Sequence, residues 1–263
     1  MGGAHLTDGW EPGLDAGDSV LRRFVLANAD RNAFVASCAG GRSRRWPDLA
    51  VADPASPVLF DNAAVLLRPP PYVDLADVVR RVAEFYPPER HFVFLSAWPT
   101  PDLSGAGLLL MGHPPFMLRP PGGTPPPIPQ GLRIVPVTGQ ESLDDFVRTL
   151  VRAYPLPEAR GTVLGDVRVL RGPVRLFVGY DGDRPVATSG ARLGHGIVDV
   201  EWVSTLPSHR RRGIGAALTW AATLVSPTLP ATLIASDEGQ PVYEAMGYLR
   251  VMRLTMWHRP PVV

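Results

Sequence analysis

The 263-residue sequence contains no lysine and a single cysteine, Cys38, and these absences exclude several kinds of chemistry. One cysteine can form neither an internal disulfide nor the cysteine cluster of a structural zinc site. A lone cysteine in an apolar segment such as FVASC is more typical of a core position than of a nucleophile. Without lysine, the chain offers no side-chain amine that an acyl donor could modify.

The sequence also has no excess of charge and no long apolar run. Its formal net charge is +1, whereas a general nucleic-acid or membrane-surface binder usually has a clear basic excess. No apolar stretch approaches the ~20 residues that a membrane-spanning helix needs, and the N-terminal residues do not resemble a signal peptide. We therefore expect a cytoplasmic protein that binds neither nucleic acid nor membranes. With 45% hydrophobic residues, the chain can bury a globular core.

Proline and glycine, by contrast, are abundant, and they are densest in RPPGGTPPPIPQG, residues 119–131. Such a segment can form neither a helix nor a central strand, so it predicts an extended linker. The predicted division is a first domain at 1–118, a linker at 119–130 and a second domain at 131–263.

Hydrophobic periodicity predicts a mixed α/β (α+β) architecture in both halves. In the second half we expect helices at 141–154, 210–224 and 238–246, and strands at 174–180, 185–192, 197–205, 232–235 and 248–257. In the first half we expect helices at 19–37, 73–85 and 102–111, and strands at 48–52, 58–68, 91–97 and 116–119. The shared order of elements indicates a divergent internal repeat, in which each copy is a mainly antiparallel sheet flanked by helices.

The densest positive charge, Arg210 to Arg212, runs directly into Gly213-Ile214-Gly215, after an apolar strand and at the start of a predicted helix. A helix N-terminus has unpaired backbone N–H groups and a partial positive charge, both of which suit phosphate. Glycine lets a ligand approach the backbone closely, and arginine adds charge-assisted hydrogen bonds. The run matches neither a Walker loop nor a dinucleotide fingerprint. The alternative is a solvated basic turn.

Two segments together resemble the GNAT N-acetyltransferase superfamily. P-x-x-R-x-x-G-I-G after a strand is similar to its acyl-CoA-binding motif, with Arg210, Gly213 and Gly215 at the matching positions. SDEGQPVYEAMGYLR, at 236–250, is similar to a second signature, in which a tyrosine precedes a glycine-aromatic pair by four residues; here the tyrosine is Tyr243. The resemblance covers roughly residues 131–258. It implies two GNAT-like domains, acetyl-CoA as co-substrate and no metal.

The resemblance also implies where the coenzyme binds. The amides from Arg211 to Ala216 are expected to cradle the pyrophosphate, and the end of the preceding strand to pair with the pantetheine arm. Ser236 stands where relatives often carry an asparagine that touches pantetheine. The expected cofactor-binding residues are Val203, Ser204, Thr205, Arg210, Arg211, Arg212, Gly213, Ile214, Gly215, Ala216 and Ser236.

The same resemblance assigns catalytic roles. Tyr243 is expected to protonate the departing thiolate, because a phenol stays protonated at neutral pH, and the backbone amide of Val203 to stabilise the oxyanion. For the general base, Glu201 is the first choice and Asp199 the second. Alternation along an unbulged strand would place both on one face together with Val203, although solvated carboxylates remain the alternative. His195 and His209 are predicted to be surface residues of turns.

The first half departs from the motifs. It has RPPPYVDLADVV where the second half has its arginine-glycine run, and Leu108 at the place of the tyrosine. It is therefore predicted to be a degenerate domain without a coenzyme site. The predicted function is N-acetyl transfer from acetyl-CoA to a primary amine of a small molecule or protein. The alternative is a catalytically silent acyl-CoA-binding or scaffolding protein, and homodimer formation is left open.

Overall fold

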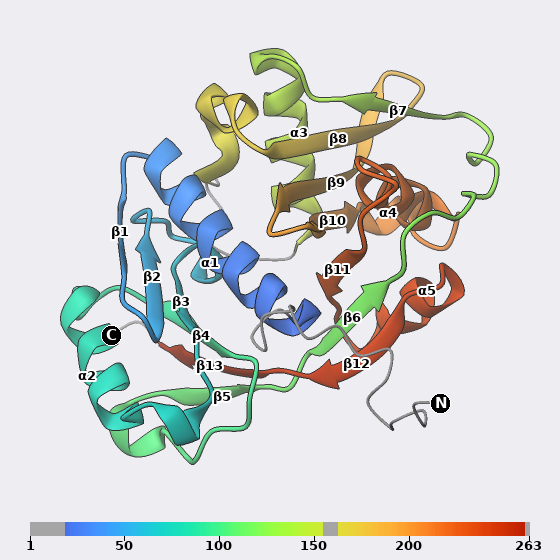
Figure 1. Cartoon of the computed structure of the whole chain (residues 1–263). Helices are drawn as coiled ribbons and strands as arrows, with labels where there is room; N and C mark the ends of the chain where they lie inside the picture. Colours follow the sequence, from blue (N-terminus) through green and yellow to red (C-terminus); the bar gives the residue numbers. More distant parts are fainter. Residues whose placement is uncertain (1–18, 155–162, 261–263) are drawn as a thin grey trace, which may run out of the picture.

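The computed structural model describes residues 19–154 and 163–260 (Figure 1). Its helices are α1 (Val20–Cys38), α2 (Leu75–Phe85), α3 (Gln140–Ala153), α4 (Ile214–Thr223) and α5 (Gln240–Ala245). The strands that end up in the first sheet are β1 (Arg42–Arg45), β2 (Leu49–Asp53), β3 (Ala63–Leu66), β4 (Phe92–Ser96), β5 (Leu109–Gly112) and β13 (Thr255–Arg259). Those of the second sheet are β6 (Pro115–Arg119), β7 (Leu132–Pro136), β8 (Val174–Asp181), β9 (Arg184–Gly194), β10 (Ile197–Thr205), β11 (Ala231–Ile234) and β12 (Leu249–Arg253).

Both sheets are mixed and mainly antiparallel, as the sequence predicted. The first has the strand order β1-β2-β3-β4-β13-β5, and the second has the order β12-β6-β11-β10-β9-β8-β7. Among the described strands, β3–β4 and β10–β11 are the parallel pairs. The predicted α/β class with two sheets flanked by helices is therefore confirmed.

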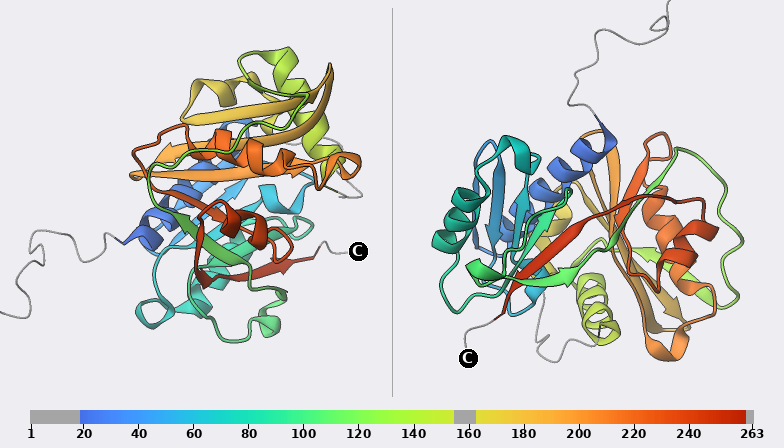
Figure 2. Two further views of the ribbon diagram at one scale, coloured as in Figure 1. Left: turned by 90° about the vertical axis from the view of Figure 1, so that its right-hand side faces the viewer. Right: turned by 90° about the horizontal axis from the view of Figure 1, so that it is seen from below.

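The two sheets share a long two-stranded ribbon in which each half lends one strand to the other. Strand β6 follows β5 directly in the chain but pairs with β11 and β12 of the second sheet. Strand β13 follows β12 but pairs with β4 and β5 of the first sheet. Seen from below, the ribbon crosses from one sheet to the other (Figure 2, right). Each sheet therefore covers an edge of its core with a strand from the opposite half, where it would otherwise be open.

Helix α1 lies between the two sheets (Figure 1). Ser19 caps its N-terminus by accepting a hydrogen bond from the backbone N–H of Arg22, at 3.1 Å. The helix contacts β1, β2 and β3 of the first sheet and β9 and β10 of the second. Phe24, which is fully buried, packs against Phe116 with ring centroids 4.5 Å apart. The interface between the halves thus has an apolar core of its own.

One predicted helix and two predicted strands were wrong. The helix expected at 102–111 is a single 3₁₀ turn, Ser104–Ala106, followed by β5. Gly107 adopts a left-handed φ of 77° there, which ends the turn. The long strand expected at 58–68 begins with another 3₁₀ turn, Leu59–Asp61. The final strand expected at 248–257 is divided into β12 and β13 at Leu254, where the ribbon changes sheets.

The predicted linker contains no helix or strand between residues 120 and 130, while Arg119 belongs to β6. The segment is held against the second half. The guanidinium of Arg119 stacks over Trp220 at 4.4 Å and donates to the carbonyl of Met246 at 2.9 Å. The N–H of Gly122 donates to the carbonyl of Pro227. In the described ranges, no helix is both long and apolar enough to cross a membrane.

Candidate active site

The turn between β10 and α4 presents a series of open backbone amides. Arg211 and Gly213 have left-handed φ angles of 60° and 76°, and α4 begins only at Ile214, four residues later than predicted. Within the part of the chain that the structure describes, the N–H groups of residues 211–216 have no hydrogen-bond acceptor. Consecutive open amides at a helix N-terminus form a concave anion site. The turn can therefore receive a phosphate group.

The three arginines of this turn do different things. Arg210 donates to the carbonyls of Thr205 and Ala153, at 3.2 and 3.3 Å, and so ties the turn to β10 and to the end of α3. Arg212 pairs with Asp181 at 3.0 Å. The guanidinium of Arg211 is exposed and has no partner among the described residues. Of the three side chains, Arg211 is the one that can meet a ligand without breaking a contact.

Gly215 and Ala216 bring the first turn of α4 close to the end of β10. A Cβ on Gly215 would lie 3.3 Å from Oγ1 of Thr205, which is tighter than an ordinary contact. Gly213 carries the left-handed φ that lets the chain enter the helix. Ile214 is 2% exposed and anchors the helix start in the core. The two glycines therefore have different roles: one shapes the turn, and the other permits close approach.

Strands β10 and β11 separate soon after they meet. They pair at only two positions, Val198 with Ala231 and Asp199 with Thr232, after which β10 continues alongside β9 alone. The side chain of Ser204 is buried and shares a hydrogen bond of 2.7 Å with Thr188. Ser204 can therefore meet a ligand only through its backbone.

A β-bulge interrupts β10 between Glu201 and Ser204, and Trp202 has a left-handed φ of 54°. The alternation considered for an unbulged strand is broken here. Gly190 pairs with Glu201, and a Cβ on Gly190 would collide with the ring of Trp202, so Glu201 and Trp202 share a face. Val203 packs instead into the cluster that includes Tyr243. The bulge thus directs Glu201 toward α1 and Val203 toward α5.

Glu201 and Asp199 are both paired with Arg31 of α1. Nη1 of Arg31 lies 2.8 Å from Oε1 of Glu201 and also contacts the carboxylate of Asp199. Burial raises the pKa of Glu201 to about 7; Arg31 opposes this rise and the charge of Asp199 adds to it. Burial raises the pKa of Asp199 as well. The Glu201 side chain is 23% exposed and that of Asp199 is 0% exposed, so only Glu201 reaches solvent.

Two phenols, Tyr243 and Tyr154, lie near this carboxylate. Tyr243, on α5, packs edge-on against Tyr248 with ring centroids 5.9 Å apart. Burial raises the pKa of Tyr243, and the charges of Tyr154 and Glu201 raise it further, so it is a neutral donor at every physiological pH. The hydroxyl of Tyr154 donates to the carbonyl of Val203 at 3.1 Å. That carbonyl lies in the strand end expected to bind pantetheine.

The other predicted residues lie farther from the carboxylate. Ser236 is exposed, and its Oγ accepts from the N–H of Gly239 at 3.0 Å, within the turn that precedes α5. His195 contacts Asp30 at 2.7 Å. His209 is only 9% exposed and lies near Asp181, so the expectation that it would be a surface residue was wrong. The 3₁₀ turn Pro207–His209 folds its ring inward. No group of three or more metal-binding side chains occurs in residues 19–154 and 163–260.

A cavity of about 280 Å³ lies between the two halves, and Glu201 and Arg31 are in its wall. Its lining is mostly apolar and comes from both halves. Tyr154, Trp202, Phe60 and Asp61 contribute to it, and sequence reasoning assigned a site role to none of them. Phe60 and Asp61 belong to the half that lacks the motifs, and neither motif of the second half includes Tyr154 or Trp202. The cavity adjoins the bulge in β10, and the open amides begin at Arg211, in the turn that follows this strand.

Comparisons with known proteins place the fold. No protein-family model matches the chain, and no curated protein matches it. Solved structures do match. A GCN5-related N-acetyltransferase from Kribbella flavida is 24% identical, with a TM-score of 0.67 over 93% of this chain and 97% of that one. A GNAT-family protein from Novosphingobium aromaticivorans is 15% identical, with a TM-score of 0.58 over 89% and 99%. A GCN5-related N-acetyltransferase from Sphaerobacter thermophilus is 14% identical, with a TM-score of 0.53 over 76% and 73%.

Proposed function

Since the chain has the fold of GCN5-related N-acetyltransferases, we propose that it transfers the acetyl group of acetyl-CoA to a primary amine. The observation that carries the proposal is the arrangement around β10. The strand leads through the turn Pro207–His209 into the open amides at α4, and its bulge directs Glu201 into a cavity between the halves. The proposed phosphate site and the carboxylate of Glu201 thus lie at the two ends of one segment, residues 201–211.

Acetyl-CoA fits the residues around the turn. The amides of residues 211–216 can hold its pyrophosphate, and Arg211 can add a charge-assisted hydrogen bond. Gly215 keeps the helix start free of a side chain. The backbone of Val203 to Thr205 is the surface offered to the pantetheine arm. The coenzyme supplies the activated thioester. The general base, the general acid and the oxyanion donor are groups of the protein.

Glu201 is the proposed general base. An amine attacks a carbonyl only when it is neutral, so its proton must be removed before or during attack. A carboxylate whose pKa is about 7 is close to the ideal for a base that works near neutral pH. Asp199 is fully buried and reaches no solvent, which disfavours it as the base. Arg31 acts as a positioning residue, because it holds Glu201 and keeps its pKa from rising further.

Tyr243 is the proposed general acid. Its raised pKa keeps the phenol protonated, so it can donate to a thiolate as the thioester breaks. Val203 lies within the bulge, where the pairing with β9 is interrupted, and its amide is proposed as the donor to the carbonyl oxygen. Direct attack by the amine is proposed, and the cavity lined by Glu201 and Trp202 is the proposed place of the acceptor.

One coenzyme site per chain is proposed, carried by the 131–263 unit, with 1–118 as its degenerate partner and 119–130 as the linker. In support, Leu108 stands at the place of Tyr243 and is 2% exposed in the core of the first half. These boundaries divide the sequence and not the two sheets, because β6 and β13 each pair in the sheet of the other half.

The test measures binding and thiol release separately. Calorimetry should find one acetyl-CoA per chain, and free thiol should appear when a panel of primary amines is added. Two equivalent coenzyme sites would contradict the degenerate first half. Tight binding with no thiol released from any amine would instead support the silent acyl-CoA-binding protein.

A further inference from the structure

The segment between β2 and β3, residues 54–62, forms one wall of the cavity. It brings Val58, Phe60 and Asp61 to the lining of the cavity that Glu201 also lines. Phe60 is a large apolar side chain that is 50% exposed, although most residues of its type are buried. An exposed aromatic ring and a carboxylate that line the same cavity are typical of ligand recognition.

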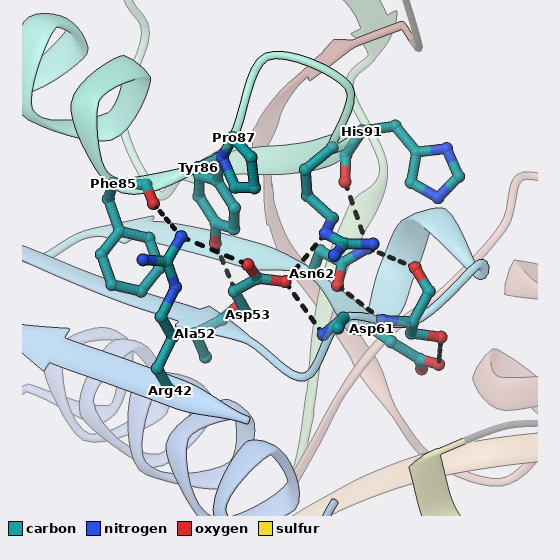
Figure 3. Close-up of polar contacts among 12 residues, drawn as sticks. Arg42, Ala52, Asp53, Asp61, Asn62, Phe85, Tyr86, Pro87 and His91 are labelled. Atoms are coloured by element: carbon teal, nitrogen blue, oxygen red, sulfur yellow. Dashed lines mark hydrogen bonds and ion pairs between the residues drawn. The ribbon is translucent and has the colours of Figure 1, made fainter. Parts of the chain in front are cut away.

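Polar contacts hold this segment in one conformation (Figure 3). Asn62 is 0% exposed, and its amide donates to the carbonyls of Ser56 and His91 at 2.9 and 3.1 Å. The carboxylate of Asp53 accepts from the N–H of Ala55, whose φ of 59° is left-handed. A loop that is held in this way presents its side chains without a further ordering cost when a ligand binds.

Asp61 differs from the neighbouring carboxylates in its partners. Asp53 has Arg90 at 3.0 Å, and Glu201 has Arg31. Asp61 has only neutral donors, the hydroxyl of Ser56 at 2.6 Å and the N–H of Val163, and no cation within ion-pair distance among the described residues. Burial raises the pKa of Asp61 to about 6. A buried negative charge without a counter-ion is costly, and a ligand cation would remove that cost.

Apart from Glu201 and Asp61, the lining includes the polar side chains of Asn28, Arg31 and Asn32, and most of the remaining wall is hydrocarbon. The apolar side chains of the lining are Val35, Val58, Phe60, Ala63, Val93, Leu95, Leu150, Val151, Val163, Ile234 and Met256. They come from both halves and make up most of the cavity wall. A ligand that spans this cavity therefore needs an apolar middle.

We propose that Asp61 binds a second positively charged group of the acceptor. The acceptor class is then a small primary amine that carries another cationic group beyond a hydrocarbon or aromatic spacer. The reacting amine lies toward Glu201, the spacer lies along the apolar walls and Phe60, and the second cation pairs with Asp61. This inference rests on the proposed function for the identity of the reacting end.

The test compares an alkyl monoamine with the α,ω-diamine of the same chain length. The unmodified protein should show a kcat/KM at least tenfold higher for the diamine. Asp61→Asn should lower the diamine value about tenfold and leave the monoamine value unchanged, because the amide still accepts from Ser56 but has no charge. Glu84→Gln, an exposed carboxylate on α2, is the matched control. No preference for the diamine, or an equal loss for both amines in Asp61→Asn, would overturn the proposal.

Asp61→Glu provides a second readout, the preferred length of the diamine, which a distorted loop would not shorten. The longer side chain moves the carboxylate into the cavity by one methylene, so the preferred diamine should become shorter. An unchanged length preference in a variant that folds normally would argue against direct contact.

A binding measurement separates this inference from the proposed function. A permethylated diamine cannot be acetylated, but it keeps both charges and the spacer. If the unmodified protein binds this compound and Asp61→Asn binds it at least tenfold more weakly, the cation site is supported even if no amine is acetylated. If Asp61→Asn binds it as tightly as the unmodified protein does, the cation site is rejected, whatever the activity.

Discussion

Nη1 of Arg31 lies 2.8 Å from Oε1 of Glu201, although the two residues are 170 positions apart and belong to different halves of the chain. The arginine comes from the half without coenzyme motifs, and the carboxylate from the half that has them. The first half therefore supplies a counter-ion to the proposed base, in addition to a wall of the cavity. Removing the first half would leave Glu201 and Asp199 without this charge.

This pair predicts a shift in the pH profile of the reaction. Arg31 favours ionised Glu201, so Arg31→Met should raise the pKa of Glu201 further above about 7. Because the base works only when it is deprotonated, the acid limb of kcat/KM should move to higher pH by about one unit. The other titratable groups facing Glu201 are Asp199, Tyr154 and Tyr243.

Two further variants make that result specific. Arg31→Lys keeps a positive charge and should restore much of the normal profile. Arg80→Met removes an exposed arginine on α2 and should leave the profile unchanged. An acid limb that stays in place in Arg31→Met would show that Glu201 does not limit the rate as a base.

Tyr243→Phe should separate chemistry from binding. The substitution keeps the ring and its contact with Tyr248 while it removes the proposed proton donor. Acetyl-CoA affinity should hardly change, and kcat should fall by roughly 10²–10⁴-fold, the usual effect of losing one general acid. Calorimetry and a thiol-release assay measure the two quantities. Loss of affinity together with activity would indicate that the tyrosine supports packing.

Arg211 and Arg210 should behave differently when each is replaced by alanine. Arg211 has no partner in the described part of the chain, so its loss should weaken acetyl-CoA binding about tenfold without changing the melting temperature. Arg210 ties β10 to α3 through two carbonyls, so its loss should lower the melting temperature. Equal effects of the two substitutions on coenzyme affinity would contradict this division of roles.

Gly215→Leu should weaken coenzyme binding sharply. The new side chain would stand at the open amides, and its Cβ alone would already crowd Thr205. The control is Gly105→Leu, where a Cβ meets nothing within 4 Å. Unaltered affinity in Gly215→Leu would mean that the pyrophosphate binds elsewhere.

The exchanged strands predict that the chain stays together when it is cut between its halves. A protease site introduced near residues 124–126 should give two fragments that co-elute in native buffer and separate in denaturant. The reason is that β6 stays paired with β11 and β12, and β13 with β4 and β5. Separation of the fragments in native buffer would contradict the exchange.

The sequence by itself determined the features that depend on neighbours along the chain. Helix α1 was predicted almost to the residue, because Ser19 caps a long run of helix-forming residues. The turn with open amides was predicted because glycines between a strand and a helix are typical of an anion-binding helix N-terminus. The two mainly antiparallel sheets followed from the spacing of apolar residues.

Only the tertiary structure decided the features that join distant residues. Three features depend on what lies across a sheet or a cavity: the ion pair of Arg31 with Glu201, the bulge at Trp202, and Asp61, which has no cationic partner among the described residues. The exchange of β6 and β13 leaves no trace in periodicity, because a strand shows the same alternation whichever sheet it joins. Local sequence determines which segments form strands and helices. Which strands pair with each other depends on residues that are far apart in the sequence and meet only in the folded chain.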